Sequence, residues 1–303
     1  MKDTSRNTRL FLAILAVIVG LFMVAVAPVL IQISMERVVA ALVEVSKDKP
    51  AYSSGILIFS YTYPLYRALI FVAGVTLILL ASAIYKGEEW TYPVGLLAAA
   101  FPSAGGMFMF LPYVSWVDGF PIPMAISFVG LAFFWSFILL RKVDKWLKWA
   151  QFLALTFAGM LTTHAFTIGV GNLRMLLTRP MKPLYDGIAW WVLSWSGPIQ
   201  WICVILFFVA IYQLAARKHS GWWMALVGAV SILAIDIPTQ VIRTTMSESN
   251  SWDYLYGSLL SLGLLFALLF PKFNAALIDK SEPQPGEVEQ QRLGEAKEVA
   301  ATA

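Results

Sequence analysis

Long runs of apolar residues restrict the fold of this chain more than any other feature of its sequence. Such runs occur at eight places, namely 10–33, 64–85, 91–113, 121–140, 149–170, 189–213, 222–243 and 254–271. A helix needs about 20 mostly apolar residues to cross the hydrocarbon core of a bilayer, and charged residues make up only 13% of this chain. Only helices and closed barrels satisfy their backbone groups within lipid. The sequence therefore predicts an all-α polytopic membrane protein with eight transmembrane helices.

The basic residues and tryptophans predict the orientation of these spans. Lys and Arg are concentrated in cytoplasmic loops of membrane proteins, and the clearest loop of this kind is Arg141–Lys148 (RKVDKWLK). Tryptophan, which favours headgroup depth, falls at both ends of the spans. An even number of spans then places both termini in the cytoplasm, with the protein in the cell membrane. The first span also resembles a secretory signal peptide, but its apolar run is longer than a signal core and Pro28 follows the candidate cleavage site, so we expect it to be retained.

The sequence also contains an internal repeat. Short motifs recur in order after 132–136 residues. The pairs include Lys49-Pro50-Ala51-Tyr52 with Lys182-Pro183-Leu184-Tyr185, Ser115-Trp116 with Ser251-Trp252, and Gly130-Leu131 with Gly263-Leu264. Fixed-interval similarity is typical of duplicated architectures. Common membrane residues also recur by chance, but the constant interval favours duplication.

Each copy holds four spans, so both copies enter the bilayer from the same side. The expected architecture is two tandem four-helix repeats in parallel orientation, related by a pseudo-two-fold axis along the membrane normal. The first repeat covers 1–148 and the second 149–272. The remaining residues, 273–303, are rich in Glu, Gln and Ala and have no apolar face, which predicts a disordered cytosolic tail.

The most similar part of the two copies lies in the loop before the second span of each copy. Its members are Lys49, Pro50 and Tyr52 in the first copy and Lys182, Pro183 and Tyr185 in the second. Proline suits a turn, and lysine and tyrosine favour headgroup depth. Two interpretations remain open: a device that guides an outer hairpin back into the bilayer, and a surface for a ligand or partner. Upstream, 36–45 has a helical rhythm that favours a helix lying along the outer interface.

Ionisable residues inside spans are costly and mark candidate sites. Asp236, Thr239, Gln240 and Arg243 follow i, i+3, i+4, i+7 spacing and form a polar stripe on one helical face. His164 lies in the fifth span at about the depth of Asp236. A His164–Asp236 pair is therefore geometrically allowed, either as a proton relay or solute site or as a hydrogen bond that fixes helix packing.

Three further features bear on a site in the bilayer. Arg67 lies near the outer end of the second span, where snorkelling to headgroups is its ordinary role. Proline and glycine predict interrupted helices in corresponding spans, at Pro102, Gly105 and Gly106 in the third and at Pro238 in the seventh. Interrupted helices at matching positions indicate a transporter site, although they also occur as plain kinks.

These observations favour a small-solute or ion permease with an outward-facing polar vestibule lined by His164, Asp236, Gln240 and Arg67. The alternative is a non-catalytic structural or assembly subunit of a larger membrane complex. Two kinds of protein partner are left open, namely other membrane subunits and further copies of the chain in a homo-oligomer. A third hypothesis is an intramembrane enzyme that uses His164 and Asp236. Catalytic motifs of soluble enzymes are absent from the sequence, and with two histidines and one cysteine we expect no metal or other cofactor. The bilayer is the expected partner, and nucleic acid is not.

Overall fold

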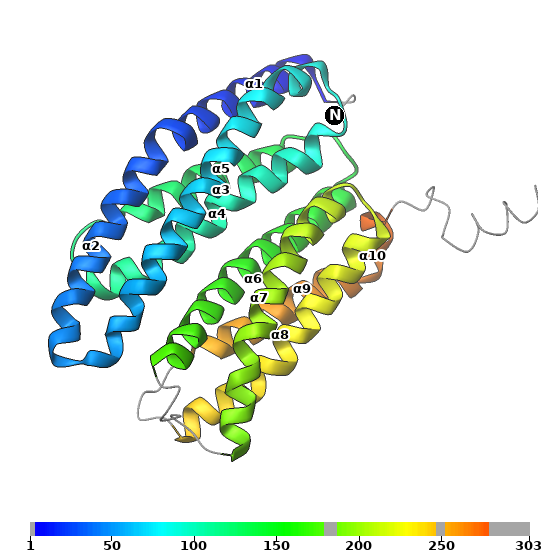
Figure 1. Cartoon of the computed structure of the whole chain (residues 1–303). Helices are drawn as coiled ribbons and strands as arrows, with labels where there is room; N and C mark the ends of the chain where they lie inside the picture. The colour runs from blue at the N-terminus through cyan, green and yellow to red at the C-terminus, as the bar shows by residue number, and fades with distance from the viewer. Residues whose placement is uncertain (1–3, 179–186, 247–251, 279–303) are drawn as a thin grey trace, which may run out of the picture.

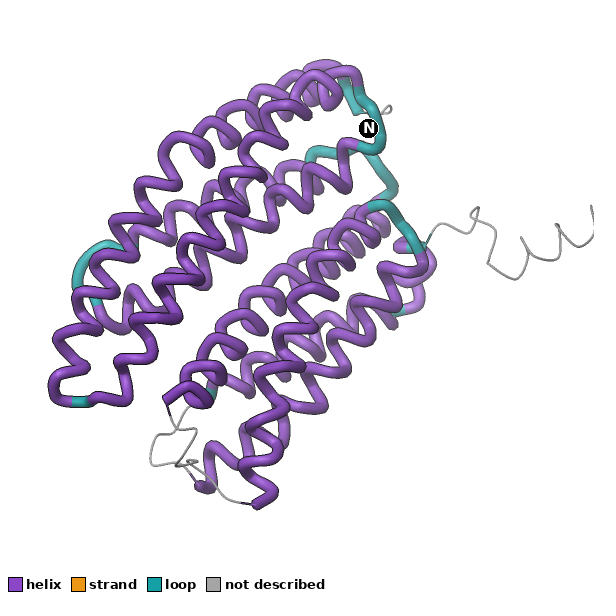
Figure 2. The backbone as a smooth tube through the Cα atoms, viewed as in Figure 1, coloured by secondary structure: helices purple, strands orange, loops and turns teal. Residues whose placement is uncertain are grey.

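The computed structural model describes residues 4–178, 187–246 and 252–278, and every element in these ranges is helical (Figure 2). The α-helices are α1 (Arg6–Leu21), α2 (Ala27–Asp48), α3 (Ser53–Lys86), α4 (Thr91–Trp116), α5 (Ile122–Leu139), α6 (Lys145–Thr178), α7 (Gly187–Ala215), α8 (His219–Met246), α9 (Asp253–Leu269) and α10 (Pro271–Leu277). A π-helical turn, Phe22–Val26, joins α1 to α2 without a break, and a short 3-10 turn, Pro50–Tyr52, precedes α3. The prediction of a multi-pass, all-helical membrane protein is confirmed.

Within the described ranges, seven helical segments are long and apolar enough to cross a bilayer, and α9 with α10 forms an eighth candidate that is bent by 75°. The helices reach further than the predicted spans. The first segment runs continuously through 43 residues and α3 through 34, so both extend past the roughly 20 residues that the hydrocarbon core requires.

The segment 36–45 does not form a separate interfacial helix, which corrects that expectation. It continues α2 in line because its apolar residues find a partner within the protein. Val38 and Leu42 are fully buried and form a small cluster with Tyr113 of α4. The Arg37 guanidinium donates a hydrogen bond of 2.8 Å to the hydroxyl of the same tyrosine.

The helices form two four-helix groups, α1–α5 and α6–α10, with α1 and α2 counted as one long helix and α9 and α10 as one bent pair (Figure 1). In each group the helices pack in a ring in chain order: α3 on α1 and α2, α4 on α3, and α5 on α4, then α7 on α6, α8 on α7, and α9 on α8 and α6. This shared ring order is compatible with the predicted halves of 1–148 and 149–272, whose origin by duplication stays a prediction.

Both ends of the described chain lie at one end of the molecule (Figure 1). Thr4 accepts a 3.3 Å hydrogen bond from the backbone N–H of Lys142, and the Lys272 ammonium lies 4.6 Å from the ring centre of Trp146. We call this the terminal end, and the end that carries Pro50–Tyr52 the distal end. The terminal end is the one that the sequence predicts to be cytoplasmic.

The two halves meet through non-equivalent faces. The first half contacts the second mainly through α4, which packs on α6 and α7, and α3 also packs on α6. Phe101 of α4 stacks on Phe208 of α7 with ring centres 4.6 Å apart. A two-fold axis would require α8 to pack on α3 as α4 packs on α7, and extensive contacts of that kind are not formed among the described residues. The expected pseudo-two-fold relation therefore does not describe this interface.

The prolines and glycines of α4 and α8 do not break these helices, which corrects the expected interruptions. Helix α4 continues through Pro102, Gly105 and Gly106, and α8 continues through Pro238. The glycines instead allow close packing. A Cβ added to Gly105 would overlap the Tyr66 ring, and one added to Gly106 would lie 2.5 Å from the backbone nitrogen of Ser127.

The first residues of the predicted tail, which starts at residue 273, are helical. Helix α10 covers its first residues, because Phe273 and Leu277 are buried among the cores of α6 and α9. Residues 279–303, for which disorder is predicted, lie outside the described residues.

The contact of α1 with α3 provides a test of this packing. A Cβ added to Gly74 would lie 2.7 Å from Met23 Cβ and 2.8 Å from the carbonyl oxygen of Gly20. We expect Gly74→Val to lower the free energy of unfolding by about 1–3 kcal/mol, as overpacking does. Thermal unfolding in detergent measures this. The control is Gly159→Ala on α6, where nothing lies within 4 Å of an added Cβ. Equal stability of the two variants would contradict the close approach of α1 to α3.

Candidate functional site

A buried carboxylate, held by two side chains from neighbouring helices, lies in the second half. Asp236 of α8 is fully buried. Its Oδ2 lies 3.0 Å from Nε2 of His164 on α6, and its Oδ1 accepts a 2.6 Å hydrogen bond from Nε2 of Gln200 on α7. Gly257 of α9 packs directly against His164 and Asp236, because a Cβ there would overlap both groups. All four helices of this half thus contribute to one site, which we call the Asp236 cluster.

The contact between His164 and Asp236 agrees with the pairing inferred from their equal depth. Gln200 is not predicted from the sequence, since only ionisable residues and the stripe on the helix of Asp236 mark a site there. A signal for it does exist: Ser196 and Gln200 are four residues apart in an otherwise apolar stretch and so share a helix face. Both side chains are fully buried.

A second polar network lies distal to the Asp236 cluster. The Asn172 amide donates to the hydroxyl of Ser196 over 3.0 Å, and the Tyr254 hydroxyl donates to the Asn172 oxygen over 2.9 Å. The three side chains come from α6, α7 and α9, and all are buried. Since Asn172 is two turns from His164, the two networks form a continuous polar interior along the second half.

Two further residues of the stripe, Thr239 and Gln240, have local partners. Thr239 is buried and donates to the carbonyl of Ile235 over 2.6 Å. Gln240 accepts from the backbone N–H of Leu255 over 3.0 Å and donates to Thr244 over 2.9 Å, so it ties α8 to the start of α9. These contacts explain both residues as supports of the helix pair.

Arg67 does not join the Asp236 cluster. Its guanidinium donates a 2.7 Å hydrogen bond to Oε1 of Gln32, which in turn donates to Glu36 over 2.7 Å. These residues lie on α2 and α3 of the first half, so the structure does not bring Arg67 together with His164 and Asp236.

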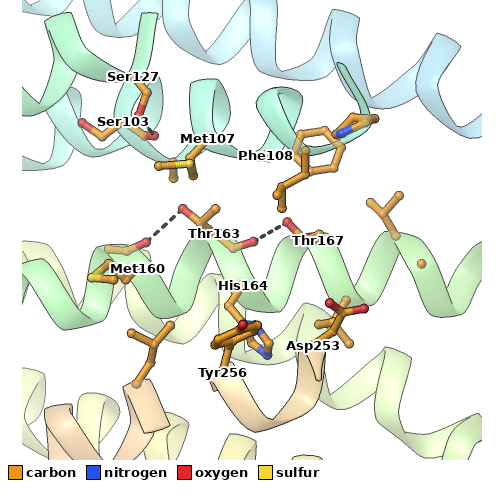
Figure 3. Close-up of a pocket in the computed structure, with 18 of the residues that line it drawn as sticks. Ser103, Met107, Phe108, Ser127, Met160, Thr163, His164, Thr167, Asp253 and Tyr256 are labelled. Carbon is orange, nitrogen blue, oxygen red and sulfur yellow. Dashed lines mark hydrogen bonds between the residues drawn. The ribbon is translucent and has the colours of Figure 1, made fainter. Parts of the chain in front are cut away.

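A cavity of about 950 Å³ lies between the two halves. Helices α3, α4 and α5 line one side and α6, α8 and α9 the other (Figure 3). His164 and Arg243 are in its wall, whereas Asp236, Gln200 and Thr239 lie behind the wall. His164, whose side chain is 10% exposed, therefore connects the cavity to the buried carboxylate.

The hydroxyl groups along the cavity donate their hydrogens to acceptors within the protein. Figure 3 shows Ser103 and Ser127 on the wall of the first half and Thr163 and Thr167 on α6 opposite. Each hydroxyl donates to a backbone carbonyl, at 2.7, 2.9, 3.2 and 2.8 Å respectively. A hydroxyl oxygen that donates one bond still accepts others. The middle of the cavity is therefore largely apolar, and its polar groups are hydroxyl oxygens that can still accept hydrogen bonds.

The first copy of the repeated loop motif packs at the distal end of this cavity. The Tyr52 ring contacts Trp116 edge-on with ring centres 5.0 Å apart, and the Arg174 guanidinium lies 5.2 Å from its centre. Trp116 and Arg174 both line the cavity. Lys49 caps α2 and Pro50 opens the following turn. Both interpretations of the motif, a folding device and a binding surface, stay predictions. Lys182, Pro183 and Tyr185 lie outside the described residues.

Within the described ranges, no three His, Cys, Asp or Glu side chains converge as metal ligands would. No protein-family model, curated protein or solved structure matches this chain. Function must therefore be inferred from the geometry of the cavity and the Asp236 cluster.

The Asp236 cluster provides a test of the pair. When a buried pair is charged, removing one partner typically costs about 3–5 kcal/mol, because the remaining buried charge is left uncompensated. We expect His164→Leu to destabilise the protein by about that amount, and a second change, Asp236→Asn, to restore most of the loss by removing the charge. Thermal unfolding of the single and double variants in detergent measures this.

The matched control is His219→Leu, because His219 is the other histidine and is exposed at the terminal end of α8. It should leave stability nearly unchanged. A double variant that is as unstable as the sum of its single changes would show that His164 does not compensate the charge of Asp236.

Proposed function

We propose that this multi-pass membrane protein is a permease that binds its solute in the cavity between its two halves. The observation that carries this proposal is the cavity itself, about 950 Å³ in volume and lined by helices from both halves. Ligand sites of this size, with mostly apolar walls and a few placed polar groups, are typical of small-molecule binding. Sites at the interface of two membrane repeats are typical of transporters.

In this proposal the Asp236 cluster responds to whether a solute occupies the cavity. Of the cluster's members, His164 alone is in the wall. The carboxylate belongs to α8 and the imidazole to α6. A solute that contacts His164 therefore alters the hydrogen bond between two helices of the second half. The pair is thus the element through which the cavity influences helix packing.

The proposal is tested by cysteine accessibility, which needs no knowledge of the solute. The chain has one cysteine, Cys203, which is buried. In a Cys203→Ser background, Ala100→Cys and Thr167→Cys place a thiol at two depths of the cavity wall. We expect a membrane-impermeant thiol reagent to modify both positions when added from either side of sealed vesicles, because a permease opens its site to each side in turn.

The control is Leu79→Cys on α3, a lipid-facing position that is 75% exposed, which should react from neither side. Modification of the cavity thiols from one side only would contradict the permease and favour a structural subunit. The same experiment with His164→Leu tests the cluster, and we expect a changed ratio of reaction rates from the two sides.

A further inference from the structure

The shape of the cavity restricts the molecule that fits it. On α6 the lining residues run from Leu155 to Arg174, which is about 28 Å at about 1.5 Å per residue. The volume of about 950 Å³ is spread along that length. The cavity is therefore elongated and suits a chain-like molecule better than a compact solute.

The polarity of the cavity changes along its length. Its part nearest the terminal end is lined by Ala100, Leu131, Phe134, Trp135 and Leu155, which offer apolar surface. Trp135 donates its indole N–H to Thr156 over 3.2 Å, so that polar group is already used. At the distal end apolar residues such as Ile58, Phe59 and Leu111 continue the lining, but charged and polar residues join them, including two guanidinium groups. A ligand that matches both ends has an apolar chain and one polar head.

The charge at the distal end is complementary to an anion. Among the described lining residues, Arg174 and Arg243 lie there together with a single carboxylate, Asp253. Among the described residues, the Nε of Arg243 is buried and has no hydrogen-bond partner, which is costly for a charged group. The Arg174 guanidinium also faces the Tyr52 ring. Guanidinium groups bind carboxylate and phosphate oxygens with two parallel hydrogen bonds.

From these observations we propose that the cavity binds a lipid-like amphiphile, with an anionic carboxylate or phosphate head at Arg174 and Arg243 and an aliphatic chain that extends between the halves. This inference rests on the proposed function, because it names the substrate class of the same cavity. The chain passes between the Ser103–Ser127 wall and the Thr163–Thr167 wall, where each hydroxyl hydrogen is already bound to a backbone carbonyl (Figure 3). Water gains few hydrogen-bond acceptors and no hydroxyl donor there, so an apolar chain fills that part of the cavity better than water does.

The test is equilibrium binding to the purified full-length protein in mild detergent. The probe is a long-chain fatty acid with a photoreactive diazirine near its methyl end, compared with the fatty alcohol of the same chain. We expect the acid to bind about tenfold more tightly or better, the range for hydrogen bonds to charged groups. Cross-links should map to the apolar part of the cavity, around Phe134, Trp135 and Leu155. A long-chain alkyl phosphate serves as the second anionic probe, and tighter binding of it would identify phosphate as the preferred head.

Two sets of variants keep the test independent of folding. The double variant Arg174→Gln/Arg243→Gln should lose the preference for the acid and keep the affinity for the alcohol. Its matched control is Arg67→Gln, which removes a distal arginine outside the cavity wall. Gly159→Leu should fill the cavity and abolish binding of both probes, because Gly159 lines the cavity and nothing lies within 4 Å of an added Cβ. Gly159→Ala should leave binding nearly intact.

Equal binding of acid and alcohol, an unchanged preference in the arginine double variant, or cross-links on lipid-facing residues would each overturn the proposal. Such results would indicate a cavity that bilayer lipid fills without selection. Failure here is distinct from failure of the permease. Selective binding of the acid together with cavity thiols that react from one side only would retain the ligand and exclude transport, whereas two-sided reaction without selective binding would retain transport and exclude this ligand.

Discussion

The hydrocarbon core of the bilayer offers no hydrogen bonds, and the organisation of this protein follows from that constraint. The backbone satisfies itself within helices, and hydroxyl groups such as those of Ser103, Thr163 and Thr167 donate to carbonyls of the preceding turn. A carboxylate cannot be satisfied in that way. Asp236 therefore requires partners from other helices, and His164 and Gln200 supply them. The most costly group in the bilayer thus fixes the arrangement of α6, α7 and α8.

The two halves have the same ring order but different interiors. The second half contains the Asp236 cluster and the network of Asn172, Ser196 and Tyr254. The interior of the first half is dominated by aromatic rings, among them Tyr63, Tyr66 and Phe108. The halves also meet through non-equivalent faces. This asymmetry gives the cavity one mainly apolar wall and one wall that leads through His164 to the buried Asp236.

The sequence predicts the helical class and the depth of each residue, because apolar runs and helix rise determine both. Depth is enough to relate His164 to Asp236. Depth does not identify the partner of Arg67. That partner is Gln32 because one particular face of α3 meets α2, and periodicity cannot assign that face in a helix that is apolar all round. The expected breaks at the prolines are wrong for a related reason: one lost hydrogen bond does not break a helix whose glycines pack closely on neighbours such as Tyr66 and Ser127. Gln200 becomes recognisable only once α7 is placed beside α8.

If the space between the halves is a ligand site, the ligand should stay bound when the protein is extracted from the membrane. Native mass spectrometry of the protein released from its own membrane in mild detergent tests this most directly. We predict a monomer or homo-oligomer that retains an anionic lipid-like molecule, and this adduct should be lost in Gly159→Leu. A stable, stoichiometric set of other subunits with no retained small molecule would contradict a ligand site and identify the protein as a structural component of a larger complex.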